Sequence, residues 1–147
     1  MKITNAAILA VATVGALHLV QRERHQRQQN EVAVSRIQDS WLTHLTTNPD
    51  LAKLWAPDMD PEEYVQILHA NQQICALSLR YKLGQIGVDK LRFLASELMS
   101  REICRRYWAK YGEFRLREAA GNKRAETFNG ILQDEYVARP ETQPVGV

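Results

Sequence analysis

The chain has 147 residues, which is enough for one domain with a single compact core. Hydrophobic residues make up 45% and charged residues 24% of it, with only 7 glycines and 5 prolines, a composition that excludes a disordered or collagen-like chain. The formal net charge of +2 gives the whole molecule no strong field for nucleic acid. Its 2 cysteines, Cys75 and Cys104, are far apart in sequence, which argues against a disulfide-stapled secreted scaffold.

The first apolar segment runs from residue 3 to residue 20 and contains no charged side chain. At about 1.5 Å per residue, a helix of this length spans roughly 27 Å, close to the apolar thickness of a bilayer. Three interpretations compete: a signal peptide, a transmembrane anchor and a buried soluble helix. No small-residue cleavage site follows the segment and no polar face interrupts it. The pattern therefore favours a membrane anchor that comprises residues 1–21. The polar residues Asn5 and His18 keep the soluble interpretation open.

Basic residues on either side of this segment indicate its orientation. Lys2 precedes it, whereas Arg22, Arg24 and Arg27 follow it directly. Because basic residues tend to stay on the cytoplasmic side, we expect a single-pass protein of the cell membrane with its body in the cytoplasm. Gly15 and the alanines near it permit close approach of two helices in lipid, so homo-oligomerisation is a further expectation.

Residues 22–47 contain no glycine and no proline, so the same helix is predicted to continue as a stalk that enters the body. The first part of the stalk is polar on all sides. Farther along, Val34, Ile37, Trp41 and Leu45 recur at spacings of three and four, which predicts one buried stripe of an amphipathic helix.

The remaining residues predict a bundle of short helices over residues 48–138 and a flexible tail over residues 139–147. Asn48-Pro49-Asp50 and Asp60-Pro61-Glu62-Glu63 both combine a capping side chain, a proline at the first helical position and an acidic first turn. No window alternates as β-strands do. The predicted fold class is therefore all-α, an N-terminal transmembrane and stalk helix followed by a small helical bundle. The expected bundle helices cover residues 49–56, 61–83, 88–99, 101–111 and 122–138.

A polar residue on the predicted long helix gives the first candidate site. Asn71 lies on the apolar face between Leu68 and Cys75, where an unpaired amide would cost roughly 1–3 kcal/mol. Two interpretations remain open: a buried hydrogen bond that fixes the helix register, or a polar anchor in a ligand pocket. The pocket would be lined by Asn71, Gln72, Tyr107 and Trp108.

The second candidate site is the segment richest in basic and aromatic residues, Arg101 to Arg117. Between Arg101 and Arg124, eight basic residues meet three acidic ones, whereas the segment between Asn48 and Glu63 is acidic. The segment is predicted to hold a protein partner or anionic lipid, or else to be a solvated face whose aromatic residues belong to the core. Its candidate contact residues are Arg101, Arg105, Arg106, Tyr107 and Trp108.

No sequence pattern indicates catalysis, a cofactor or a metal. The four histidines form no pair at ligand spacing, and neither a glycine-rich phosphate loop nor a nucleophile elbow is present. Both cysteines are expected to be buried structural thiols. The leading hypothesis is a membrane-anchored interaction or regulatory protein without catalytic activity. The alternative is a small enzyme or ligand-binding accessory protein of specialised metabolism, with a pocket near Asn71 and Trp108.

Three stretches of the chain carry a family resemblance: NPDLAKLWAP at residues 48–57, NQQICALSLR at residues 71–80, and RRYW at residues 105–108 followed by Phe114-Arg115. With them the chain resembles an actinobacterial family of unknown function, of the Streptomyces type. The likeness covers nearly the whole chain. It implies a short protein with an apolar N-terminal helix and an all-helical body, and it implies no activity, catalytic residue or cofactor.

Overall fold

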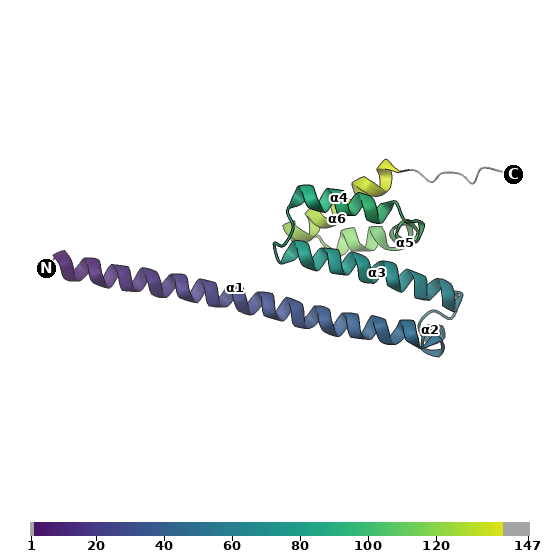
Figure 1. The fold of residues 1–147 in the computed structure, drawn as a ribbon, viewed down its shortest axis with the longest axis horizontal. Coiled ribbons are helices and arrows are strands. Elements are labelled where there is room, and N and C mark those ends of the chain that lie inside the picture. Colours follow the sequence, from purple (N-terminus) through teal and green to yellow (C-terminus); the bar gives the residue numbers. More distant parts are fainter. Residues whose placement is uncertain (1, 140–147) are drawn as a thin grey trace. The chain divides into compact units, whose positions relative to one another are not determined.

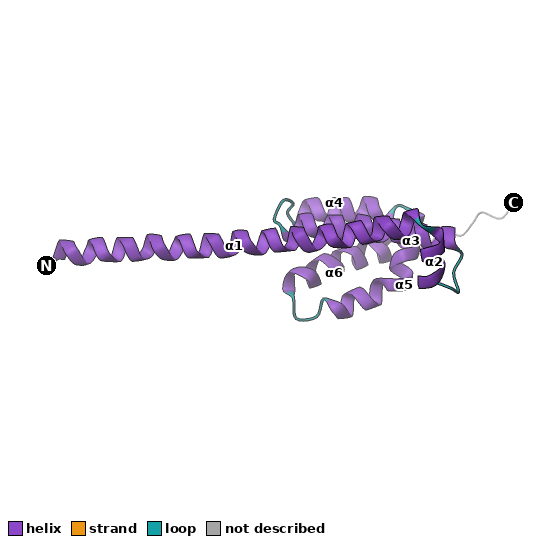
Figure 2. Cartoon of the chain, turned by 90° about the horizontal axis from the view of Figure 1, so that it is seen from below, coloured by secondary structure: helices purple, strands orange, loops and turns teal. Residues whose placement is uncertain are grey.

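The computed structural model describes residues 2–139, with their side chains described from residue 16 onward. All regular secondary structure in this range is helical, as the sequence predicts (Figures 1 and 2). The helices are α1 (Lys2–Thr47), α2 (Pro49–Trp55), α3 (Pro61–Lys82), α4 (Val88–Met99), α5 (Glu102–Glu118) and α6 (Lys123–Ala138).

The chain divides into two units, Met1–Arg36 and Ile37–Val147, so the last turns of α1 belong to the second unit. Within the described residues, no helix is both long and apolar enough to cross a membrane. The expected anchor at residues 3–20 therefore gains no support here, and most of its side chains lie outside the described part. Apart from Arg139, the expected tail at residues 139–147 also lies outside it.

The main core of the second unit lies between α3, α4, α5 and α6. Each of these helices contributes one stripe of apolar residues, the pattern expected of amphipathic helices in a bundle. The most deeply buried side chains include Ile74 from α3, Leu91 from α4, Trp108 from α5 and Leu132 from α6. The predicted bundle thus has one continuous core that all four helices share.

A smaller core joins the last turns of α1 to α3. Leu42 and Leu45 are buried against Leu68 of α3. The predicted buried stripe of α1 is therefore wrong in most of its residues, because they face away from this contact. Of its residues only Leu45 is buried, while Val34, Ile37 and Trp41 are exposed.

The reason is a set of polar contacts that select another face of α1. Gln72 of α3 donates to Asp39 at 3.1 Å and to Thr43 at 3.3 Å. Gln38 donates to the thiol of Cys75 at 3.4 Å. These residues share a face with Leu42, which lies one position beyond Trp41 and therefore about 100° further around the helix.

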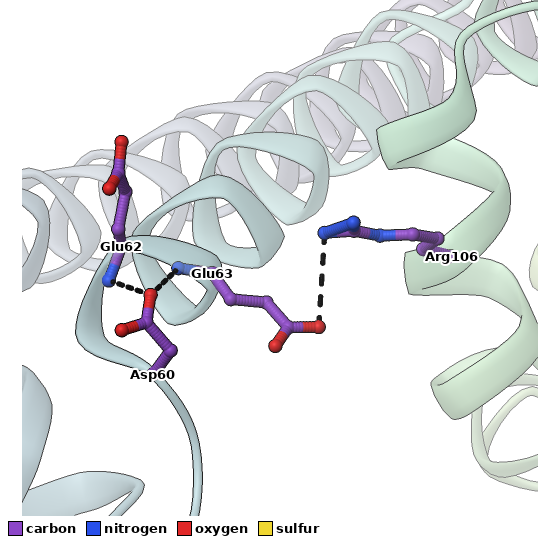
Figure 3. A network of polar contacts seen from close by, with 4 residues as sticks. All are labelled: Asp60, Glu62, Glu63 and Arg106. Carbon is purple, nitrogen blue, oxygen red and sulfur yellow. Dashed lines mark hydrogen bonds and ion pairs between the residues drawn. The ribbon is translucent and has the colours of Figure 1, made fainter.

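The start of α3 follows the sequence closely. Asp60 accepts hydrogen bonds of 3.0 Å from the backbone N–H groups of Glu62 and Glu63, and Pro61 occupies the first turn (Figure 3). Asn48 behaves differently from its predicted role as a cap of α2. Its amide donates to the carbonyl of His44 at 2.8 Å and so closes the end of α1.

The end of α5 differs from the prediction, because the helix passes through Gly112 and continues to Glu118. Gly112 is needed for packing and not for a turn. A Cβ at this position would lie 2.7 Å from Nε1 of Trp108, so only glycine leaves room for the indole ring. The chain instead turns after α3 and α5 at Gly84 and Gly121, both at positive φ.

Candidate functional site

Asn71 is satisfied by two side chains of α5. Its Oδ1 accepts hydrogen bonds from Oη of Tyr107 at 2.8 Å and from Nη1 of Arg115 at 3.1 Å. Arg115 also donates to Oη of Tyr107 at 3.0 Å, which closes a three-membered network. The arrangement corresponds to the buried hydrogen bond that fixes how α3 lies against α5.

The network combines a cation with weakly acidic groups. Burial raises the pKa of Tyr107, although the guanidinium of Arg115 acts in the opposite direction. The thiol of Cys75 lies 3.6 Å from Oδ1 of Asn71 and 3.9 Å from Nη1 of Arg115. Within the described residues no carboxylate lies at ion-pair distance from Arg115, and its Nε is buried without a partner.

Arg115 is not among the contact residues that the sequence predicts. The available signal is its spacing, since Arg115 follows Tyr107 by eight residues and so lies near the same face of α5. A charged side chain on a predicted apolar face indicates a buried polar contact. The predicted helix ends at residue 111 and so does not include Arg115, which is why the prediction takes no account of this spacing.

The other residues of the expected pocket contact different neighbours. Gln72 binds the last turns of α1 through Asp39. Trp108 is buried in the core, and its Nε1 donates to Gln133 of α6 at 2.8 Å. The structure therefore brings Asn71 and Tyr107 together, whereas Gln72 and Trp108 make their polar contacts elsewhere.

The arginines of the predicted basic site make contacts within the molecule. Arg101 donates to Gln73 at 2.9 Å, and Arg105 donates to the carbonyl of Tyr136 at 3.1 Å. Arg106 reaches from α5 toward Glu63 at the start of α3, with 3.8 Å between the charged atoms (Figure 3). The basic segment thus helps to hold α3, α5 and α6 together.

The two thiols lie in different environments. Cys104 is fully buried, and this burial raises its pKa although the nearby Arg101 lowers it. Cys75 is only half-buried, in the network of Asn71. No cluster of three or more histidine, cysteine or acidic side chains that could hold a metal ion occurs in the described part of the chain.

In the second unit, four exposed apolar side chains lie on the last turns of α1 and on α2. Figure 1 shows how α2 follows the end of α1. We call Ile37, Trp41, Leu54 and Trp55 the tryptophan patch. Their side chains are 72%, 46%, 77% and 61% exposed, respectively. The rings of Trp41 and Trp55 meet edge to face, with 5.7 Å between centroids and 84° between planes.

The tryptophan patch lies in an acidic stretch of the chain. Between Ile37 and Glu63 there are six carboxylates and one lysine. The exposed carboxylates in this stretch that form no ion pair with any described residue include Asp39, Asp50, Asp58 and Glu62. The stretch of chain that carries the patch therefore has a net negative charge that ion pairs leave largely uncompensated.

Comparison with known proteins identifies a family. A family model described as a family of unknown function (DUF6082) matches residues 3–146. The chain belongs to this family. Membership of DUF6082 confirms the expected resemblance to a family of unknown function over nearly the whole chain, while the actinobacterial source stays a prediction. No curated protein and no solved structure matches this DUF6082 chain.

Proposed function

We propose that this DUF6082 protein is a non-catalytic interaction protein that docks a partner protein on the tryptophan patch. The supporting observation is the exposure of Trp41 and Trp55 on a unit whose core is complete without them. Monomeric proteins rarely expose contiguous apolar surface without a functional reason, and tryptophan is enriched among the residues that dominate binding energy.

Both tryptophans lie on helices that buried residues hold in place. Trp41 lies in the last turns of α1, which Leu42 and Leu45 fix against α3. Trp55 ends α2, which is held by the fully buried Ala52. A side chain that is already ordered loses little conformational entropy when it binds, so a preorganised patch favours affinity.

The segment Arg101 to Arg117 is a weaker proposal for the same role. It would hold an acidic partner or anionic lipid, but Arg105 and Arg106 already contact Tyr136 and Glu63. Binding there would replace contacts that stabilise the bundle, whereas binding at the tryptophan patch replaces only water.

Membrane attachment of this interaction protein is a proposal that rests on the sequence of residues 3–20 alone. Cell fractionation tests it with the full chain beside a chain that lacks residues 1–20. The proposal expects the full chain to sediment with membranes, to resist alkaline carbonate and to be released by detergent, while the shortened chain stays in the supernatant. Equal distribution of both chains would contradict it.

Docking at the tryptophan patch is tested by site-specific photo-crosslinking in the producing cell. A photoreactive phenylalanine analogue replaces Leu54 in the test variant and Phe93 in the control variant. Phe93 is a suitable control because its side chain is also exposed, at 57%, but lies on α4. The proposal expects one discrete protein adduct from position 54 that excess unlabelled chain suppresses, and no matching adduct from position 93. The same adduct pattern from both positions, or none from position 54, would contradict docking at the patch.

A further inference from the structure

We infer that the segment docked on the tryptophan patch is a basic amphipathic helix of the partner protein, an inference that rests on the proposed function. Two features of the patch define this occupant: the spacing of its apolar side chains and the charge around them.

Neighbouring apolar side chains of the patch are separated by about the height of one helical turn. Ile37 precedes Trp41 by four residues, which corresponds to about 6 Å along α1. The rings of Trp41 and Trp55 are 5.7 Å apart, and Leu54 is the neighbour of Trp55. Anchors on one face of a helix, at positions i, i+4 and i+7, recur at about the same interval, so the apolar side of a helix matches the spacing in the patch.

Exposed carboxylates close to the patch in sequence form no ion pair with any described residue. Asp50 precedes Leu54 by four residues and therefore lies on the same side of α2. Asp58 follows Trp55 by three residues and is exposed. Lysine or arginine residues that flank the apolar side of the docked helix would meet these carboxylates, which favours this partner in specificity and in the rate of encounter.

The same charge disfavours two other occupants. Anionic lipid would be repelled by Asp50 and Asp58. A second copy of this chain in a two-fold dimer would bring each acidic surface against its equivalent, because such an interface contacts the same surface on both subunits. Like charges placed together oppose such an association.

The test measures peptide binding to the purified full chain. The probe is a fluorescent 14-residue helix of leucine and lysine with its leucines on one face, and its counterpart has glutamate at every lysine position. We expect the leucine–lysine peptide to bind at least tenfold tighter than the leucine–glutamate peptide. Trp55→Ala should weaken it at least tenfold, and the matched control Phe93→Ala should leave its Kd unchanged.

A second variant pair isolates the charge. Asp50→Asn with Asp58→Asn should weaken binding of the leucine–lysine peptide three- to tenfold. Asp89→Asn with Glu97→Gln on α4 removes the same charge from another surface, including an aspartate in the first turn of a helix, and should leave the Kd unchanged. Circular dichroism of every variant verifies that the helices are retained.

Four results would overturn the inference. Equal affinity for both peptides, or equal losses in both charge variants, would show that the patch does not select basic helices. Tighter association with phosphatidylcholine vesicles than with the leucine–lysine peptide would assign the patch to lipid. A dimer in sedimentation equilibrium that Trp55→Ala dissociates would assign it to a second copy. An adduct from position 54 without peptide selectivity would retain the docking function and remove only the basic helix, whereas the absence of that adduct removes the function itself.

Discussion

Asn71 shows how a sequence can reveal that a residue needs polar partners without revealing which residues they are. Its position between Leu68 and Cys75 places an amide on an apolar face, and this alone requires a buried partner. The partners Tyr107 and Arg115 come from α5, 36 and 44 residues later in the chain. Packing of α3 on α5 decides which side chains meet, and a periodicity within one helix contains no such information.

Substitution of Asn71 tests the network. Asn71→Leu should lower the free energy of unfolding by about 1–3 kcal/mol, because the hydroxyl of Tyr107 and the guanidinium of Arg115 lose their shared acceptor. Asn71→Asp keeps an acceptor oxygen at this position and should lose less. Urea denaturation measures both, and equal stability of Asn71→Leu and the unchanged chain would contradict the assignment.

Because burial raises the pKa of Tyr107, the stability of the chain should depend on pH. Burial raises the pKa of its phenol above the ordinary value of about 10, so the unfolded chain loses this proton first as pH rises. Stability should therefore be unaffected by this group below pH 10 and fall with rising pH above it. Tyr107→Phe should make that fall shallower in denaturation curves measured between pH 9 and pH 11. A slope unchanged by the substitution would show that the phenol does not contribute.

At the scale of the elements, the sequence specifies helix starts better than helix ends or faces. Asp60 and Pro61 act locally, so the start of α3 is predictable from the residues themselves. Gly112 also resembles a local stop, but its role depends on the indole ring of Trp108 one turn earlier. The buried face of α1 is decided by contacts with α3 and so could not be chosen from apolar spacing alone.

Replacement of two glycines inside helices by alanine should have opposite effects on the stability of the chain. Gly112→Ala should destabilise the chain by about 1–3 kcal/mol, because the added Cβ would displace the buried ring of Trp108 and its hydrogen bond to Gln133. Gly130→Ala on α6 meets no atom within 4 Å and should stabilise by about 0.5–1 kcal/mol through its better helix propensity. Thermal unfolding of the two variants compares them directly. Destabilisation of equal size in both would contradict the packing role of Gly112.

At the scale of the whole molecule, helical periodicity predicts the all-α class, and three short sequence stretches carry the resemblance to a family of unknown function. The structure of the described residues confirms the class, and the family match confirms the resemblance. The surface that carries the proposed function could not be predicted in the same way. Trp41 belongs to an apolar repeat that normally marks a buried stripe, and only the packing of Leu42 and Leu45 on α3 leaves it exposed. An apolar repeat alone does not reveal whether the chain itself or a partner covers it.

The proposed function requires that a partner covers the tryptophan patch in the cell. Hydroxyl-radical footprinting tests it most directly, by comparing the oxidation of each residue in living cells with that in the purified chain at the same concentration. We predict that Trp41 and Trp55 are oxidised severalfold less in cells while Phe93 is unchanged, with the buried Trp108 slow in both samples. Oxidation of Trp41 and Trp55 at the same rate relative to Phe93 in both samples would contradict the claim.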